Sequence, residues 1–577
     1  MVWMIIVVFI VSYLIHFSKV TNLQTMVSSD GDGYYAYLPA LFIQNDASYR
    51  KTKKMQESYS VGGQNYYYLN KTNKGRVINK FYPGTAIFHL PAFTFTSLLL
   101  SVFQKPITGY SSLYMLGVFF TGLFFSLFGI YFLLKALKIY FKNYLKDKSN
   151  SIWIGVFCIF FGTNLFVSAL SNPSFSHTYS FFLFCLLIYI FQTYLSDKKV
   201  IKLIFLGLLI GILFLVRPTN ILFVLFLIFF FSSLEEFKLF LQDFFSFKKT
   251  SFIFLLIPFL LSASIIIFLS KWQTSEYFYW SYKGEGFNFF KPHFWETWFS
   301  YRIGIFVHNP LLFISLIGLY YLYKDNKFRF YCWLLYFLFI TYIISSWWCW
   351  DYESSFGHRG FSEHFILFFF PFIYLLKNLG RNKVIVSLII ISILYIMMRF
   401  YQKIEGIFPR QKFTKETYWK SFLDLKSNET AKYLNLEHCF PFGEIKKTTC
   451  LKTNYSSYNF DDRKEFAFET KFNFPQKRIQ NRFVVEISFN KKPLGKMNWK
   501  DIFLVTDSYS EIDNSREYAA NPIYNFYEEG QQNFSTSIIH KELFVCSNQK
   551  DFVNIYIWNQ GKKKFKIKDL KIKVYEY

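Results

Sequence analysis

Apolar residues gather into long runs in the first 400 residues of the chain and alternate with polar residues after that. Eleven of these runs approach the ~20 residues that a helix needs to cross a bilayer. The pattern therefore predicts a polytopic α-helical membrane part over residues 1–401. The expected spanning helices are residues 1–18, 110–134, 151–170, 177–195, 201–216, 219–233, 251–270, 303–323, 328–346, 361–377 and 383–401.

A further apolar run, residues 85–103, decides which loops share a side of the membrane. Lys and Arg prefer the cytoplasmic side. If this run lies along the outer interface, basic loops such as "SDKKVIK" and "KNLGRNK" face inward, and if it crosses, the bias inverts. Pro91 within the run favours a broken, partly amphipathic helix. We therefore expect residues 19–109 to form a first outer loop with interfacial helices, and the C-terminus to lie outside.

From residue 402, short stretches alternate apolar and polar side chains with the period of half-buried β-strands. The stretches are "EFAFETKFNF", "RFVVEISFN", "DIFLVTDSY", "STSIIHKELFV", "FVNIYIWNQG" and "LKIKVYEY". Several short strands with no helices between them predict a jelly-roll-like β-sandwich over residues 402–577. On the topology above, this domain is extracytoplasmic, and Cys439 and Cys450 could then form a disulfide.

The composition agrees with a membrane protein and limits the partners. The chain has 577 residues, is 53% hydrophobic and carries 64 Lys and Arg against 38 Asp and Glu, a formal net charge of +26. In a soluble protein this charge would suggest nucleic acid. The cytoplasmic loops of membrane proteins are basic by rule, so we expect no nucleic-acid partner here. The seven cysteines show no CxxC spacing for a metal.

Polar residues from separate loops gather at the outer ends of the expected helices. Lys and Arg there can bind a phosphate, and a carboxylate can act as general base toward a hydroxyl or an amine. The combination fits transfer from a lipid phosphate. The residues are Asp30 and Asp32 in "SSDGDGYYAYLP", Lys80 and Tyr82 in "NKFYPG", His177 in "SFSHTYS", Arg217 in "VRPTN", His308 in "VHNP", and Asp351, Glu353, His358 and Arg359 in "WWCWDYESSFGHRG".

Simple structural roles stay open for each of these residues. Asp30 and Asp32 stand in a "DGDG" run whose residues readily form turns. Lys80 could anchor the chain at the interface, Arg217 could snorkel from a helix end, and a single histidine such as His177 is more often structural.

Two further groups have a structural explanation of their own. Glu363 and His364, just inside the tenth expected helix, could be a structural pair. The tryptophans at 347, 348 and 350 fit an interfacial aromatic belt.

With these motifs, roughly residues 1–400 resemble the GT-C superfamily of membrane glycosyltransferases. The similarity is to the glycosyltransferase family 39-like group, which includes protein O-mannosyltransferases and the aminoarabinose transferase of lipid A. It rests on "SDGDGYYAYLPAL", "KFYPGTAIFHLPAF", "GILFLVRPTNIL" and "SSFGHRGFSEHFILFFFPF". The resemblance implies a GT-C-like fold in a bacterial inner membrane. The implied donor is a sugar on a polyprenyl phosphate, used at the outer face, and the acceptor is a lipid, a glycan or a protein.

The resemblance also implies roles by position. Asp30 would be the catalytic base or orient the acceptor, because family motifs place a tyrosine a few residues after the key aspartate, as Tyr34 is placed here. Asp32 is the second candidate. Lys80 would bind the donor phosphate or shape the site. Two arginines would contact the same phosphate, Arg217 and Arg359.

The remaining site candidates are taken as substrate-binding, and some positions depart from the family. Tyr82, His177, Glu353 and His358 complete the expected site. Gly31 stands where many relatives have Glu, residues 82–84 replace a Pro-Pro pair, and position 358 is often Gln in similar sequences.

Three functions fit this sequence. The first is an inverting glycosyltransferase with no cofactor, in which basic side chains stabilise the departing phosphate so that no metal is needed. The second is a lipid-linked glycan transporter or flippase, for which mid-membrane polar residues and internal repeats would be typical. The third is a polysaccharide polymerase or ligase, which shares the fold and lipid donor but moves whole glycans. The C-terminal domain would bind glycan or act as a structural cap.

Overall fold

The structure is a computed structural model that divides into two compact units, Met1–Phe400 and Tyr401–Tyr577. The expected first helix at residues 1–18, Glu353 and Cys439 all lie outside the described residues. The described residues are 23–59, 66, 68–144, 149–246, 251–282, 284–352, 356–404, 415–425, 447–451, 457–460, 465–473, 482–493, 502–509, 516–522, 527–532, 535–545, 552–560, 562 and 564–576.

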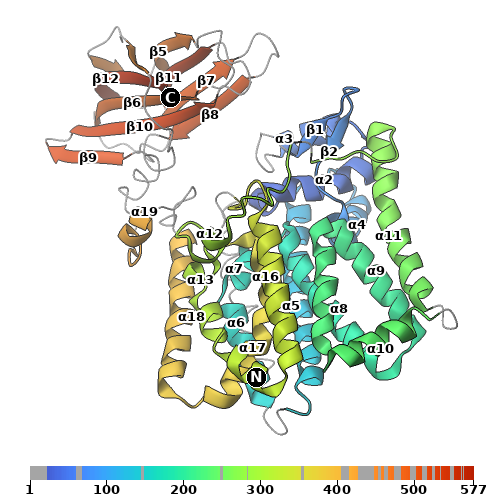
Figure 1. Cartoon of the computed structure of the whole chain (residues 1–577). Coiled ribbons are helices and arrows are strands. Elements are labelled where there is room, and N and C mark those ends of the chain that lie inside the picture. The colour runs from blue at the N-terminus through green and yellow to red at the C-terminus, as the bar shows by residue number, and fades with distance from the viewer. Residues whose placement is uncertain are drawn as a thin grey trace. The chain divides into compact units, whose positions relative to one another are not determined.

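The first unit is a bundle of helices with one small hairpin (Figure 1). The 3-10 helices are η1 (Leu23–Met26), η2 (Pro218–Phe230) and η3 (Arg359–Phe365), and the hairpin strands are β1 (Leu69–Lys71) and β2 (Val77–Asn79). The α-helices are α2 (Asp30–Phe42), α3 (Arg50–Ser58), α4 (Gly84–Val102), α5 (Ser112–Tyr140), α6 (Ser149–Phe161), α7 (Asn164–Ser171), α8 (Ser176–Asp197), α9 (Val200–Val216), α10 (Leu234–Phe244), α11 (Ser251–Thr274), α12 (Phe294–Phe299), α13 (Ile305–His308), α14 (Pro310–Ser315), α15 (Gly318–Asp325), α16 (Lys327–Ser345), α17 (Ile366–Leu379) and α18 (Lys383–Ile404).

Seven helices in the described part of the chain are long and apolar enough to cross a membrane, or up to nine if two bent pairs each count as one span. The bent pairs are α6 with α7, at 60°, and η2 with α10, at 118°. The prediction of a multi-pass helical membrane protein is therefore confirmed. The predicted number of eleven spans is not reproduced.

The run at 303–323 is an expected span that the structure does not form as one helix. It is divided into α13, α14 and α15, because the backbone leaves the helical region at Asn309 (φ −133°, ψ 70°) and Pro310 then begins a new helix. Pro218 likewise separates α9 from η2, and Arg217 before it is extended (φ −156°, ψ 122°).

The apolar run before α5 forms one continuous helix, α4, and is not broken at Pro91 as expected. Its length and hydropathy are those of a spanning segment, so its interfacial placement stays a prediction.

The "DGDG" run does not form a turn. It is the first turn of helix α2, which begins at Asp30 directly after Ser29 (φ 54°). A Cβ added at Gly31 would lie 2.7 Å from Cβ of Ser174, and one at Gly33 would lie 2.7 Å from Cβ of Tyr68. The glycines therefore allow α2 to approach its neighbours closely, and the turn-former interpretation is wrong.

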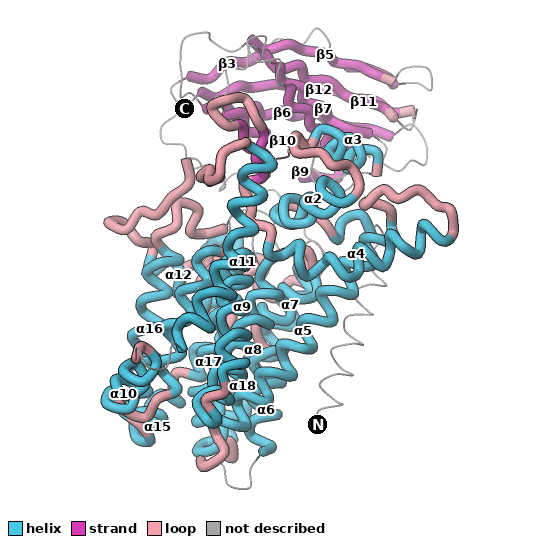
Figure 2. Tube along the Cα trace, turned by 90° about the vertical axis from the view of Figure 1, so that its right-hand side faces the viewer, coloured by secondary structure: helices cyan, strands magenta, loops and turns pink. Residues whose placement is uncertain are grey.

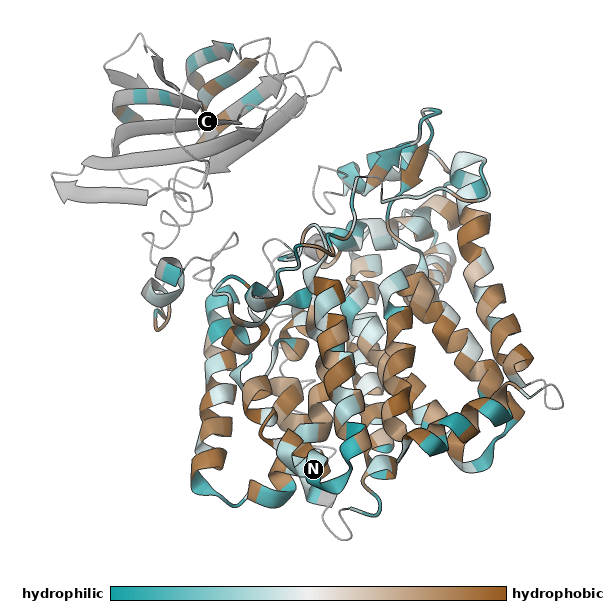
Figure 3. Cartoon of the chain, in the orientation of Figure 1, coloured by the Kyte–Doolittle hydropathy of each residue, from teal (hydrophilic) through white to brown (hydrophobic). Residues whose placement is uncertain are grey.

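The two ends of the helical unit differ in what they carry. Helices α2 and α3 and the β1–β2 hairpin lie at one end, and α10 lies at the other (Figures 1 and 2). Hydrophobic residues cover the middle of the outer helices α11, α16 and α18, and hydrophilic residues collect toward the two ends (Figure 3). This distribution is the one expected of a unit that sits in a bilayer.

Strands occupy all six stretches of the C-terminal unit that alternate in polarity, together with four further strands. A six-stranded sheet has the order β3-β12-β6-β10-β9 with β4 also beside β12, and a four-stranded sheet has the order β5-β11-β7-β8; each pairing is antiparallel. The short helix α19 (Lys415–Lys420) precedes them. The strands are β3 (Lys447–Leu451), β4 (Ser457–Phe460), β5 (Phe466–Asn473), β6 (Arg482–Pro493), β7 (Ile502–Tyr509), β8 (Arg516–Pro522), β9 (Tyr527–Gln532), β10 (Ser535–Val545), β11 (Phe552–Asn559) and β12 (Phe565–Glu576).

Candidate functional site

Asp30, the first residue of α2, forms an ion pair with Arg359, the first residue of η3. The Arg359 Nη2 atom lies 3.0 Å from Asp30 Oδ2, and each side chain is 21% exposed. Two residues that the sequence predicts for the site are therefore in contact, although more than half of the chain separates them. Because both side chains are partly exposed, this pair opens to a ligand at a lower cost than a fully buried pair would.

A second ionic group lies beside this pair and is more deeply buried. One carboxylate oxygen of Glu363 lies 3.0 Å from Nη1 of Arg217, and the other lies 2.8 Å from Nδ1 of His177. The Glu363 side chain is 1% exposed. With the carboxylate ionised, Nδ1 of His177 donates the proton, which leaves Nε2 as the acceptor nitrogen of the neutral ring.

Tyr352 connects the two groups. Its hydroxyl accepts a hydrogen bond from Nη2 of Arg217 at 3.4 Å. The guanidinium carbons of Arg217 and Arg359 lie 5.8 Å and 5.9 Å from the centre of its ring. Two arginines on one aromatic ring bring two positive charges close together, which suits an anionic ligand.

Tyr34 of α2 lies where these charges converge. Burial raises the pKa of its hydroxyl to about 12, and the charges of Arg217, Asp30 and Arg359 act on the same group. The motif places Tyr34 four residues after Asp30, and the two side chains are also close enough in space for the charge of Asp30 to act on the Tyr34 hydroxyl.

Lys80 and Tyr82 lie on a neighbouring surface formed with the chain after α11. Lys80 Nζ lies 2.8 Å from Glu285 Oε1, and these side chains are only 12% and 19% exposed. The ring of Tyr82 stacks on Tyr282 with centres 6.1 Å apart. Burial raises the pKa of Tyr282, and Asp30 and Arg217 also act on its hydroxyl, so this surface adjoins the Asp30 pair.

Asp32 is not part of this group. It is 3% exposed, and its charge acts on Tyr66, Tyr68 and Tyr110. Residues two apart on a helix point to opposite sides, so only one aspartate of the "DGDG" run can face the arginines. The structure places Asp30 there.

His358 precedes Arg359 and is fully buried. Its ring lies 5.5 Å from the ring of Tyr352 and 6.2 Å from that of Phe361, and neither ring nitrogen has a hydrogen-bond partner among the described residues. Burial lowers the pKa of His358 to about 3, so the imidazole is neutral at ordinary pH. Its contacts are aromatic rather than ionic.

Two other candidates, His308 and Asp351, have partners outside the two ionic groups. His308 Nε2 donates to the carbonyl of Tyr301 at 2.8 Å, and Asp351 pairs with Arg302. His364, which could have paired with Glu363, lies with Nδ1 3.3 Å from the hydroxyl of Tyr336, and the carboxylate of Glu363 pairs with His177 and Arg217.

Two buried asparagines fix the segment that carries His358 and Arg359. Asn164, at the break between α6 and α7, donates from Nδ2 to the carbonyl of Phe356 at 3.0 Å. Its own backbone N–H donates to Oδ1 of Asn309 at 2.7 Å. Between Phe356 and His358 the chain turns through Gly357 (φ 61°), where a side chain would be strained and its Cβ would press on Asn164.

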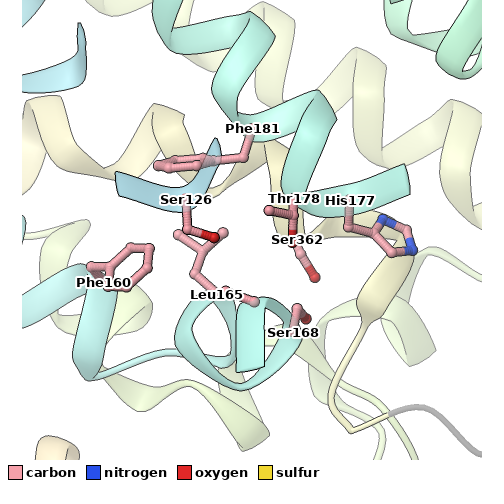
Figure 4. Close-up of a pocket in the computed structure, with 9 residues that line it drawn as sticks. Ser126, Phe160, Leu165, Ser168, His177, Thr178, Phe181 and Ser362 are labelled. Carbon is pink, nitrogen blue, oxygen red and sulfur yellow. The ribbon is translucent and has the colours of Figure 1, made fainter. Parts of the chain in front are cut away.

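A small internal cavity lies next to His177. Hydroxyls of Ser126, Ser168, Thr178 and Ser362 line it together with the rings of Phe160 and Phe181 (Figure 4). It has room for about one water molecule. The buried Ser362 hydroxyl has no partner among the described residues, which a water would supply.

Four residues of the site were not among the sequence candidates: Glu285, Tyr282, Tyr352 and Glu363. Glu363 had a usable signal, because an ionisable residue inside an apolar span is rarely without a role. The other three lie in irregular segments with no periodicity to mark them. No three or more His, Cys, Asp or Glu side chains gather as a metal site in the described residues.

No protein-family model matches this chain, and a search of curated proteins finds no significant match.

Proposed function

We propose that this chain is an integral-membrane glycosyltransferase of the GT-C type that transfers a sugar from a polyprenyl-phosphate donor to an acceptor on the outer face of the membrane. The observation that carries the proposal is the Asp30–Arg359 ion pair at 3.0 Å, with Arg217 and Tyr352 beside it. A carboxylate and two guanidinium groups are the parts that transfer from a phosphate requires.

The proposed reaction needs one base and one anion site. Asp30 takes the proton from the acceptor hydroxyl, the acceptor oxygen bonds to the anomeric carbon, and the bond from that carbon to the phosphate oxygen breaks. The electron pair stays on the departing phosphate, where Arg359 and Arg217 stabilise its charge. Attack from the face opposite the phosphate inverts the anomeric centre.

The ion pair also links donor binding to activation of the base. While Arg359 binds Asp30, its guanidinium occupies the carboxylate oxygen that an acceptor hydroxyl would need. A donor phosphate that draws Arg359 to itself would free Asp30 for the acceptor. Lys80, held by Glu285, is the second basic group that a donor could recruit in this way.

The finer features of the proposal follow from the sequence and its resemblance. The C-terminal unit would be a jelly-roll-like β-sandwich on the extracytoplasmic side of a bacterial inner membrane. Acceptors of the proposed class are lipids, glycans and proteins, and no cofactor is needed if the basic side chains supply the charge.

The test is transfer of labelled sugar from a polyprenyl phosphate by the full-length chain in lipid nanodiscs. Asp30→Asn should lower the rate about 100-fold or more, the usual contribution of a general base. The matched control is Asp197→Asn, because Asp197 also pairs with a basic residue, Lys202 at 2.8 Å, at the far end of α8. Full activity of the Asp30 variant would overturn the assignment.

Two outcomes of the same experiment would point to the alternatives. Movement of a labelled lipid-linked sugar from one leaflet of a vesicle membrane to the other, without a transfer product, would indicate a flippase. Transfer of a whole oligosaccharide from a pyrophosphate lipid would indicate a polymerase or ligase.

A further inference from the structure

Helix α3 presents a strongly basic face. Arg50, Lys51, Lys53 and Lys54 are all exposed, and Glu57 is the one acidic residue of the helix. The opposite face is buried through Thr52 and Gln56, both 0% exposed. The four cations therefore share one side of the helix.

Hydrogen bonds fix the position of helix α3. The carboxylate of Asp46 accepts hydrogen bonds from the backbone N–H of Lys51 at 2.6 Å and of Thr52 at 3.4 Å, which fixes the first turn of α3. On the buried side, the hydroxyl of Tyr68 donates to Gln56 at 3.0 Å. A surface that is already ordered loses little entropy when it binds a ligand.

The neighbouring hairpin continues the basic character. Lys71, Lys74 and Arg76 of the β1–β2 hairpin are exposed. One lysine of each element has a carboxylate partner: Lys74 pairs with Glu276 at 3.0 Å, and Lys53 of α3 pairs with Glu57 at 3.9 Å. Helix α3 and the hairpin lie beyond α2 at the end of the helical unit (Figures 1 and 2), away from the apolar middle of the bundle (Figure 3).

An aromatic cluster connects the buried side of α3 with helix α2, which carries Asp30. Tyr68 packs with Tyr34, Tyr49 and Phe81 in one buried cluster. Tyr34 in turn lies within the electrostatic reach of Asp30. Helix α3 therefore packs on the same helix that begins with Asp30, and a chain-like ligand held on α3 would extend along α2 to the proposed reaction centre.

We propose that the basic face of α3 binds an anionic glycan, one that carries phosphate or carboxylate groups, and that this glycan is the acceptor. The proposal rests on the proposed function. Exposed Lys and Arg clusters attract such polymers and raise their local concentration. Basic residues are disfavoured in outer loops. Binding of an anionic acceptor would explain why four of them lie on one helix of the expected outer loop.

The test uses the full-length chain in nanodiscs of neutral phosphatidylcholine, with fluorescent long-chain polyphosphate as the probe. One variant replaces the four α3 cations with glutamine: R50Q, K51Q, K53Q and K54Q. The matched control removes four exposed lysines of α5 and of the segment after α8: K135Q, K138Q, K198Q and K199Q. We expect the α3 variant to bind about 10-fold more weakly at low salt, and the control to bind as the wild type does.

Two results would overturn the proposal. In the first, both variants bind polyphosphate equally. In the second, anionic phosphatidylglycerol in the nanodisc lowers probe binding by a much larger factor for the wild type than for the α3 variant, which would mean that lipid head groups occupy the face and not merely that the bilayer repels the probe. Binding is measured without transfer, so a chain that binds polyphosphate through α3 but transfers no sugar would refute the proposed function alone.

Discussion

The burial of an ion pair should decide how much folding free energy the protein loses when the carboxylate of the pair is neutralised. The helical unit has three ion pairs that differ in burial. Glu363 pairs with Arg217 at 3.0 Å and is 1% exposed. Glu285 pairs with Lys80 at 2.8 Å and is 19% exposed, and Glu276 pairs with Lys74 at 3.0 Å and is 37% exposed. The distances are nearly equal, so burial is the main variable.

The expected losses of folding free energy follow from desolvation. Glu363→Gln removes the negative charge that faces Arg217 and replaces one of the two acceptor oxygens with an NH2 donor, so one of the two partners, Arg217 or His177, loses its acceptor; breaking a buried pair in this way costs about 3–5 kcal/mol. Glu276→Gln removes an exposed pair worth about 0–1 kcal/mol. Glu285→Gln should fall between these values, because water reaches its partner only in part.

The assay is thermal unfolding of the detergent-solubilised full-length chain, followed by intrinsic tryptophan fluorescence. We expect the midpoint to fall most for Glu363→Gln, less for Glu285→Gln and least for Glu276→Gln. The double variant R217M/E363Q should recover part of the loss, because it removes the unpaired buried charge. If Glu276→Gln lowers the midpoint as much as Glu363→Gln does, burial does not control these pairs and the reasoning fails.

Three further predictions concern the segments around the site. Burial lowers the pKa of His358 to about 3, below its value in the unfolded chain, so its contribution to stability is complete above about pH 6.5 and is lost as the pH falls toward 3. His358→Gln should therefore flatten this part of the pH dependence of the unfolding midpoint. An unchanged slope would show that protonation of His358 does not cause it. Gly31→Ala should destabilise the protein by about 1–3 kcal/mol because its methyl group would press on Ser174, whereas equal stability would show that α2 can shift. Asn164→Ala should speed hydrogen exchange at the amides after Phe356, which a mass-spectrometric comparison with Asn220→Ala, another buried asparagine, would test.

Helices and strands followed closely from the sequence where a long pattern repeats. Hydropathy placed α5, α8, α11, α16 and α18 within a few residues, and strict alternation marked the strands from β5 to β12 that it covered. The predictions of helices failed where a residue that interrupts the backbone lies inside a run of high mean hydropathy. A window over 303–323 does not register that a single asparagine and proline interrupt it.

The "DGDG" run failed for a different reason. Glycine and aspartate favour turns in isolation, but here the missing side chains admit Ser174 and Tyr68 against α2. That requirement comes from tertiary packing and is not visible in twelve residues of sequence.

The sequence predicted which residues gather on the outer side of the membrane. It did not predict which carboxylate pairs with which basic residue. Shared location requires only the topology of the helices, whereas the partner of each charge depends on distances between distant segments. Glu363 illustrates the difference, because its neighbour in sequence, His364, suggested a pair that the structure replaces with His177 and Arg217.

This pairing changes what the basic residues mean for the proposed function. Each of Arg359, Arg217 and Lys80 is matched by a carboxylate of the same chain, namely Asp30, Glu363 and Glu285. The site is therefore nearly neutral as it stands, and a donor phosphate must compete for its cations. It competes best at Arg359, because the carboxylate of that pair, Asp30, is 21% exposed whereas Glu363 is 1% exposed, so opening the Asp30 pair costs less desolvation than opening the Glu363 pair. On the proposed mechanism the buried Glu363 then holds Arg217 in place, while the accessible Asp30 is the carboxylate that donor binding releases.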